Sequence, residues 1–209
     1  MEEISIKGSK LHLLPIIHGL VGEEKKVREA FERIKPDCIA IGIPPEDIEI
    51  MAKMEKEESK EELEISLQYQ YYLMHLSKYG KVSLPPMDIK TAYEIAEENN
   101  IPIKAIDIDD NEYAELLVDN VSIFALIRHS MKLKKLRRKK FKAGNAKEFV
   151  KEWQKEMQSI KSFRRLEEIR DKKMVENIVK LCKEFKKILA IIPFEKYESL
   201  ILKLERYKK

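Results

Sequence analysis

The sequence predicts an α/β fold in which a mostly parallel sheet of four or more strands is covered by helices. Four short segments are apolar and of strand length. Most of them are continuously apolar instead of alternating, which is typical of strands that helices cover on both faces. Amphipathic helical patterns separate them, as in βαβ units. The predicted strands span residues 11–17, 37–43, 103–108 and 188–192.

The chain between the first two predicted strands has one apolar helical face. Val27, Ala30, Phe31 and Ile34 recur at positions i, i+3, i+4 and i+7. Pro36 follows and ends the helical pattern. Strand, helix and strand form a βαβ unit, whose crossover we expect to be right-handed.

Three helices are predicted between the second and third strands. An acidic helix runs from residue 45 to about residue 59, and a tyrosine-rich helix ends near Gly80. The third helix, residues 88–100, repeats the amphipathic pattern and stops before Pro102. The tyrosines are expected to pack in the core and at its rim, in preference to stacking on a ligand. They are Tyr69, Tyr71 and Tyr72.

From residue 109 to residue 206 the sequence is helical except for the fourth strand. Two apolar stripes with helical spacing predict core faces. No linker rich in Gly, Ser or Pro and no repeat of fixed period divides the chain. We therefore predict one domain, residues 1–209, with a helical basic insertion at residues 130–163. The stripes are Phe149, Trp153, Met157 and Ile160, and Val175, Ile178, Cys182 and Phe185.

The composition predicts a substantial core and a surface dense in charges of both signs. Hydrophobic residues make up 44% of the chain and charged residues 37%, yet 41 Lys and Arg against 37 Asp and Glu leave a net charge of only +4. Such a balance is typical of thermophile-like surfaces laced with ion pairs. Cys38 and Cys182 lie in apolar segments, which predicts buried, reduced thiols.

Targeting signals are missing from the sequence. The N-terminus lacks the basic-then-apolar order of a signal peptide, and no apolar stretch approaches the roughly 20 residues of a membrane span. We therefore expect a soluble, cytoplasmic protein without an integral membrane segment. The glycine-rich nucleotide loops, the Gly-x-Ser-x-Gly elbow and the His-Glu-x-x-His zinc motif are also missing. Nucleotide-binding folds and hydrolase folds that depend on these motifs are therefore excluded.

Polar side chains follow the carboxyl ends of the predicted strands, where an open parallel sheet binds its ligands. Imidazole, carboxylates and an ammonium would meet in one crevice there. That set suffices for general acid–base catalysis or for holding one metal ion. Asp109 or Asp110 can instead be an ordinary N-cap, and His12 and His129 are expected to be structural or solvated. The residues at this rim are His18, residues 44–47, Asp107, Asp109, Asp110, Glu195 and Lys196.

Four stretches of the chain, in this order, carry a resemblance to a known family. They are LLPIIHG, IKPDCIAIGIPPED, PPMDIKTAYEIAEENNIPIKAIDID and RDKKMVENIVKLCKEFKKILAIIP. Together they resemble the TraB/PrgY family, which is similar in turn to the Tiki metalloproteases, the GumN proteins and the wider erythromycin-esterase-like and ChaN-like group. The resemblance covers about residues 11–200. It implies metal-dependent hydrolysis at the rim of the sheet.

The family's site motifs are kept only in part. His18 ends a Gly-x-x-His-like stretch whose glycine is replaced, and Gly42 stands where the second strand carries a glutamate. Lys196 stands in place of a second histidine. A metal held by two histidines and a glutamate could not form, because a charged ammonium does not bind metals. We interpret the site as degenerate, with His18 either a remnant or one residue of a rewired site.

The resemblance also assigns roles to residues that match other motifs. Asp88 and Lys90 correspond to a Glu-Met-Arg-like stretch, and Asp107 and Asp109 to an Asp-Arg-Asp-like strand end. An Arg-Asp-x-x-Met stretch survives from Arg170. No cofactor and no metal-ligand set is predicted, and a divalent metal ion would enter only in an active enzyme. The candidate catalytic residues are His18, Asp88 and Asp107, and the candidate ligand-binding residues are Lys90, Asp109, Arg170, Glu195 and Lys196.

Three functions remain open from the sequence. The first is binding of a small anionic ligand or a peptide end by His18, Lys90 and Lys196, without family-type hydrolysis. The second is an active hydrolase or peptidase with a site rewired around His18. The third is a basic module, in which the eight Lys and Arg from Lys132 to Lys142 bind nucleic acid or an anionic membrane surface. The alternative for that basic run is a solvated helix end and loop.

Overall fold

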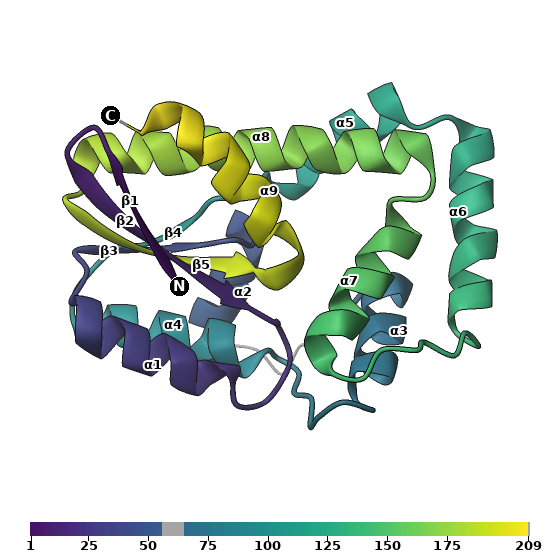
Figure 1. The fold of residues 1–209 in the computed structure, drawn as a ribbon, viewed down its shortest axis with the longest axis horizontal. Coiled ribbons are helices and arrows are strands. Elements are labelled where there is room, and N and C mark those ends of the chain that lie inside the picture. The colour runs from purple at the N-terminus through teal and green to yellow at the C-terminus, as the bar shows by residue number, and fades with distance from the viewer. Residues whose placement is uncertain (56–64, 209) are drawn as a thin grey trace.

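The computed structural model describes residues 1–55 and 65–208 and confirms the predicted α/β fold. A five-stranded sheet with the order β1-β2-β5-β3-β4 lies at its centre (Figure 1). Strands β2, β5, β3 and β4 run parallel, and β1 pairs with β2 in the antiparallel sense. All four predicted strands are present. The strands are β1 Glu2–Ile6, β2 Ser9–Ile16, β3 Cys38–Ile41, β4 Ile103–Ala105 and β5 Lys187–Pro193.

Among the described strands, β1 alone was not predicted from the sequence pattern. Ile4 and Ile6 are buried and alternate with more exposed residues, as expected for an edge strand with one covered face. Lys7 and Gly8 form the two-residue turn to β2, with φ of 50° and 84°. Positive φ at both positions is what a tight hairpin turn requires, and glycine supplies it without strain. Two apolar positions in five residues are too few to stand out in the sequence.

Helices cover both faces of the sheet. Along β5, Ile188, Ala190 and Ile192 face α8 and α9, whereas Leu189 and Ile191 face α1 and α4. Period-two alternation therefore explains why the strands are apolar throughout: each face meets a helix layer. The helices are α1 Glu23–Ile34, α2 Pro45–Glu55, α3 Leu67–Leu76, α4 Met87–Glu98, α5 Asp110–Asn120, α6 Ile123–Leu136, α7 Ala146–Met157, α8 Lys161–Glu184 and α9 Phe194–Leu204, with a 3₁₀ turn at Glu205–Tyr207.

The predicted core faces of these helices are confirmed. Val27, Ala30, Phe31 and Ile34 are all buried on α1. The stripe beginning at Val175 packs on the sheet through α8, and Cys38 and Cys182 are buried free thiols. The predicted acidic helix is α2 up to residue 55, and its last positions, 56–59, lie outside the described residues.

A helical lobe stands beside the sheet, built from α3, α6 and α7 (Figure 1). Its core contains Phe149 and Trp153 of the predicted stripe, and also Tyr72 and Leu76 of α3. The predicted insertion, residues 130–163, supplies the second half of α6 and all of α7. Since α3 precedes it by more than fifty residues, the lobe is completed by a segment from the other half of the chain.

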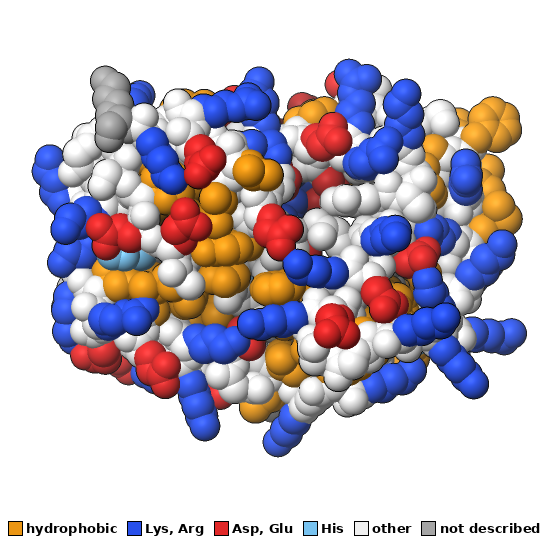
Figure 2. Space-filling model, in the orientation of Figure 1, with side chains coloured by type: hydrophobic (Ala, Val, Ile, Leu, Met, Phe, Trp, Pro, Cys, Tyr) orange, Lys and Arg blue, Asp and Glu red, His pale blue; other side chains and the backbone are white. Residues whose placement is uncertain are grey.

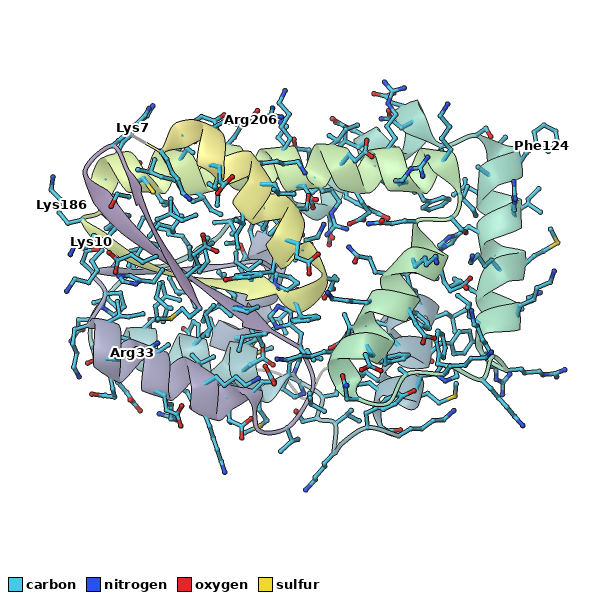
Figure 3. The ribbon with its side chains drawn as sticks, viewed as in Figure 1. Lys7, Lys10, Arg33, Phe124, Lys186 and Arg206 are labelled. Atoms are coloured by element: carbon cyan, nitrogen blue, oxygen red, sulfur yellow. The ribbon has the colours of Figure 1, made fainter. Side chains whose placement is uncertain are left out.

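The outer surface carries charges of both signs, as the composition predicts. Lys and Arg side chains lie among Asp and Glu side chains over most of the face shown in Figure 2. The hairpin turn at Lys7 lies at the opposite end of the molecule from Phe124 on α6 (Figure 3). Among the described residues, no helix is long and apolar enough to cross a membrane.

Candidate functional site

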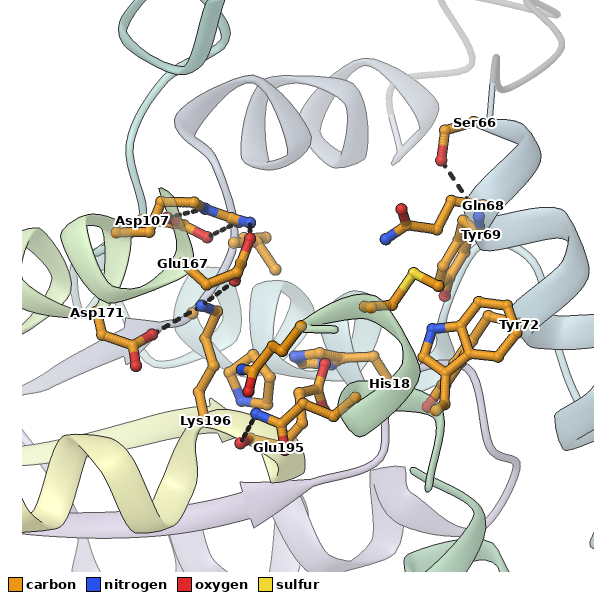
Figure 4. A pocket seen from close by; sticks show the side chains of 18 of the residues that line it. His18, Ser66, Gln68, Tyr69, Tyr72, Asp107, Glu167, Asp171, Glu195 and Lys196 are labelled. Atoms are coloured by element: carbon orange, nitrogen blue, oxygen red, sulfur yellow. Dashed lines mark hydrogen bonds and ion pairs between the residues drawn. The ribbon is translucent and has the colours of Figure 1, made fainter. Parts of the chain in front are cut away.

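A cavity of about 460 Å³ lies at the carboxyl ends of the parallel strands, between the sheet and the helical lobe. This is the rim at which the sequence predicts a ligand site. Figure 4 shows Asp107, Glu167, Asp171 and Lys196 gathered on one side of the cavity, with His18 and Glu195 below. The opposite side is formed by α3 and its N-cap. The residues labelled there are Ser66, Gln68, Tyr69 and Tyr72.

His18 and Asp88 form a buried pair in the wall of this cavity. His18 follows β2, and its Nδ1 shares a hydrogen bond with Asp88 Oδ2. Asp88, in the first turn of α4, is 0% exposed and also accepts a hydrogen bond of 3.3 Å from the backbone N–H of Gly19. A carboxylate only accepts, so Nδ1 carries the proton and the neutral ring has its lone pair at Nε2.

The other ring nitrogen of His18 has unused bonding capacity. Nε2 is buried and finds no hydrogen-bond partner among the described residues. An unsatisfied buried polar atom costs about 1–3 kcal/mol. Burial lowers the pKa of His18, but the Asp88 charge and hydrogen bond, with Glu195 and Glu23, outweigh it and leave this pKa above 6.5. A proton acceptor of tuned basicity therefore adjoins the cavity.

Two glycines, one next to His18 and one in the cavity lining, fix the local geometry. Gly19 has a φ of 84°, and a Cβ there would lie 2.8 Å from Leu73 Cδ2, so only glycine allows the turn that presents His18. Gly42 replaces the glutamate that the family resemblance implies for the second strand. A Cβ at Gly42 would lie 2.5 Å from Pro193 Cδ, which leaves no room for an acidic side chain in this packing.

Five charged side chains form one network on the α8 side of the cavity. Arg170 binds Asp107 with both nitrogens of one edge, at 3.3 Å from Nε and 2.5 Å from Nη2, and binds Glu167 at 2.6 Å. Lys196 Nζ lies 2.7 Å from Glu167 and 2.8 Å from Asp171. Burial raises the pKa of Glu167, but the charges of Lys196 and Arg170 outweigh it and lower this pKa to about 2. We name Asp107, Glu167, Arg170, Asp171 and Lys196 the charged cluster.

Two of the predicted ligand-binding residues lie outside the cavity. Lys90 is on the outer face of α4, where its side chain is half exposed and its Nζ lies 3.7 Å from Glu94. Asp109 is the N-cap of α5 and accepts a hydrogen bond of 2.7 Å from the Glu112 N–H. The sequence left open whether Asp109 or Asp110 is the cap, and the structure assigns the cap to Asp109. The other six candidates are all at the cavity or, for Asp88, directly behind His18.

Further residues line the cavity, and of His129, Asp47 and Tyr69 only Asp47 belongs to the rim predicted from the sequence. His129, expected to be structural or solvated, lines the cavity, stacks on Phe163 at 4.1 Å between ring centroids, and leaves its buried Nδ1 unpaired among the described residues. Asp47 lines the cavity too, and burial with the nearby charges of Asp110 and Glu46 raises its pKa. Tyr69 stacks on Tyr72 and reaches the cavity, so core packing and site lining coincide there.

The described residues contain no group of side chains arranged to bind a metal ion. Within residues 1–55 and 65–208, no three His, Cys, Asp or Glu side chains are placed so that they could hold one metal ion. The chemistry that the described arrangement provides is proton transfer at His18 Nε2 beside carboxylates.

The four histidines should separate in a pH titration. His18 is expected to titrate above 6.5, whereas burial lowers the pKa of His12, His75 and His129. Because the folded pKa of His18 is raised, its pair with Asp88 contributes stability that is complete below pH 6.5 and is lost as pH rises through the folded pKa. NMR of histidine-labelled protein measures the four histidine pKa values, and the signal that is missing in His18→Gln identifies His18. If Asp88→Asn leaves the highest pKa unchanged, the pair does not exist in solution.

Comparisons with known proteins do not assign a family. No protein-family model matches the chain, and a search of curated proteins found no similar sequence. The resemblance to the TraB/PrgY family stays a prediction from the four stretches quoted above.

Proposed function

We propose that the protein is a hydrolase that works by general acid–base catalysis, with His18 as the base, and that its substrate carries a cationic group. The observation that carries this proposal is the His18–Asp88 pair, whose second nitrogen adjoins a 460 Å³ cavity without a partner among the described residues. A base oriented by a buried carboxylate is the arrangement that activates a nucleophile in many unrelated enzymes.

The proposed step is attack of water on an ester or amide carbonyl. His18 Nε2 takes a proton from water as its oxygen bonds to the carbonyl carbon, and Asp88 stabilises the imidazolium that forms. Collapse of the tetrahedral intermediate expels the alcohol or amine, which receives that proton from Nε2. Since Nε2 is buried in the cavity wall, substrate binding must shift neighbouring side chains to admit the water.

The charge of the cavity favours a cationic substrate group. Among the described residues, five carboxylates line it against two permanent cations, a balance of −3, and both cations are already bound in the charged cluster. Asp47 and Glu195 form no ion pair within the described residues. Aromatic side chains on the α3 and α7 side can hold a cation against their ring faces. Those that line the cavity are Tyr69, Tyr72 and Trp153.

Binding of a small anion by Lys90 and Lys196 is supported less well. Lys90 lies outside the cavity, and Lys196 is held between Glu167 and Asp171. An anion would have to displace a carboxylate from a buried cation before it could bind.

Ester and amide substrates with and without an ammonium group, assayed with and without divalent metal ions, test the proposal. His18→Gln should lower kcat/KM by about 10²–10⁴-fold. His12→Gln is the matched control, because His12 is a buried histidine of β2 that does not line the cavity. Activity should rise with pH through the raised pKa of His18, and Asp88→Asn should move that rise to lower pH. Turnover that is equal in both histidine variants would overturn the proposal.

A further inference from the structure

The outer face of α6 exposes large apolar side chains to solvent. Phe124 is 84% exposed, and Val118, at the end of α5, is 81% exposed. Ile123, Ile127 and Met131 are also exposed and lie four residues apart, so they form one row along the helix. We name these five residues the α6 face. Phe124 projects away from the body of the protein at the outer end of α6 (Figure 3), and hydrophobic side chains gather at this edge in Figure 2.

The chain around this face is strongly basic. From residue 121 to residue 147 there are ten Lys and Arg and no Asp or Glu, whereas the rest of the chain has 31 Lys and Arg against 37 Asp and Glu. Lys135 continues the row of Ile127 and Met131 by four residues, and Arg128 stands four residues after Phe124. The six exposed cations at the C-terminal end of α6 and after it are Lys134, Lys135, Arg137, Arg138, Lys140 and Lys142.

Within the part of the chain that the structure describes, these six exposed cations form no ion pairs with acidic residues. Lys132 and Lys139, by contrast, both pair with Glu156 of α7. A solvated helix end explains the cations near Leu136 through the helix dipole, but it does not explain the apolar row beside them.

We propose that the α6 face docks on an anionic lipid bilayer, with α6 lying in the plane of the interface. A helix of this kind places apolar side chains at the boundary between headgroups and acyl chains and its cations on lipid phosphates. Nucleic acid would use the cations alone and would leave Phe124 and Ile123 in water. An anionic bilayer is the partner that would contact both the apolar side chains and the cations.

Sedimentation of the full-length protein with vesicles tests this proposal. We expect binding to vesicles of phosphatidylcholine with about 30% phosphatidylserine, weaker binding to phosphatidylcholine alone, and loss of binding as salt is raised. Phe124→Ser with Ile127→Ser should lower the partition coefficient by at least about tenfold. Leu202→Ser is the matched apolar control, because Leu202 is exposed on α9.

A second pair of variants tests the cations. Lys134→Gln with Lys135→Gln should weaken vesicle binding by about tenfold or more, since each cation near the surface contributes to attraction. Lys183→Gln with Lys186→Gln removes the same charge from exposed positions and should have little effect. Lys186 lies at the end of the molecule opposite Phe124 (Figure 3).

Three outcomes would overturn the proposal. Equal binding to neutral and anionic vesicles would exclude the cations as its basis. Binding to a double-stranded oligonucleotide that survives Phe124→Ser with Ile127→Ser, without vesicle binding, would assign the cations to nucleic acid. A dimer that those two substitutions dissociate, again without vesicle binding, would assign the α6 face to a second copy of the chain.

Discussion

Lys196→Met should lower the free energy of unfolding by about 3–5 kcal/mol. Lys196 is 7% exposed and its ammonium is shared by Glu167 and Asp171. Methionine keeps the length and the apolar stem but removes the charge, so Glu167 and Asp171 lose their common partner at a site where no more than 30% of either side chain is exposed. Urea unfolding at pH 7 measures the loss.

Lys151→Met is the matched control for this change. Lys151 pairs with Glu198 at 2.8 Å, but both side chains are more than half exposed. Exposed pairs contribute about 0–1 kcal/mol because water and salt screen them. Equal losses in the two variants would show that Lys196 is not the centre of a desolvated cluster.

Acid should remove the difference between Lys196→Met and the unchanged protein. The pKa of Glu167 is lowered to about 2, so its pairing contributes stability that is complete above its unfolded pKa and is lost as pH falls through 2. The variant keeps only the part of this contribution that comes from Arg170, so it has less stability to lose in acid. The two unfolding free energies should therefore converge between about pH 4.5 and pH 2.

Phe149→Ala should destabilise the protein by about 3–5 kcal/mol. Phe149 is fully buried, and its ring lies within 6.1 Å, between centroids, of Tyr72, Tyr79, Phe141 and Trp153. Removing it leaves a cavity where α3 and α7 meet. Trp153 is the single tryptophan of the chain, so its fluorescence during unfolding reports on the helical lobe directly.

Phe124→Ala is the control, because the same substitution at an exposed ring should change stability by no more than about 0.5 kcal/mol. A small effect of Phe149→Ala on the tryptophan transition would mean that the lobe does not depend on this aromatic cluster. Loss of the tryptophan transition with retention of the sheet would show that the lobe unfolds by itself.

The four parallel strands and the helices beside them were predictable because their signals are local. Continuous apolar runs identified the parallel strands, and i, i+3, i+4 spacing identified the face of α1 that begins at Val27. Parallel strands with known ends also placed His18, Asp107 and Lys196 at one rim. These features could be predicted because a strand end or a helix face depends mainly on residues that are close in the sequence.

The connections across the site were not predictable, because they depend on tertiary packing. Nothing in the sequence pairs His18 with Asp88 seventy residues away, or sets Lys196 between two carboxylates of α8. Lys90 looked equivalent to Asp88, but two positions along a helix turn a side chain to a different face. His129 reaches the cavity because it stacks on Phe163 of α8, a contact that no short sequence pattern encodes.

The two outermost strands limit self-association through the sheet. A sheet edge presents unpaired backbone N–H and C=O groups that can form hydrogen bonds with another chain. In a strongly apolar sheet, such pairing leads to aggregation. Here one edge is β4, only three residues long with exposed Lys104 at its centre. The other is β1, which carries Glu2 and Glu3 and is bridged at Ile6 by Lys208. Short length, charge and a covering terminus thus keep a strongly apolar sheet from growing by edge-to-edge addition.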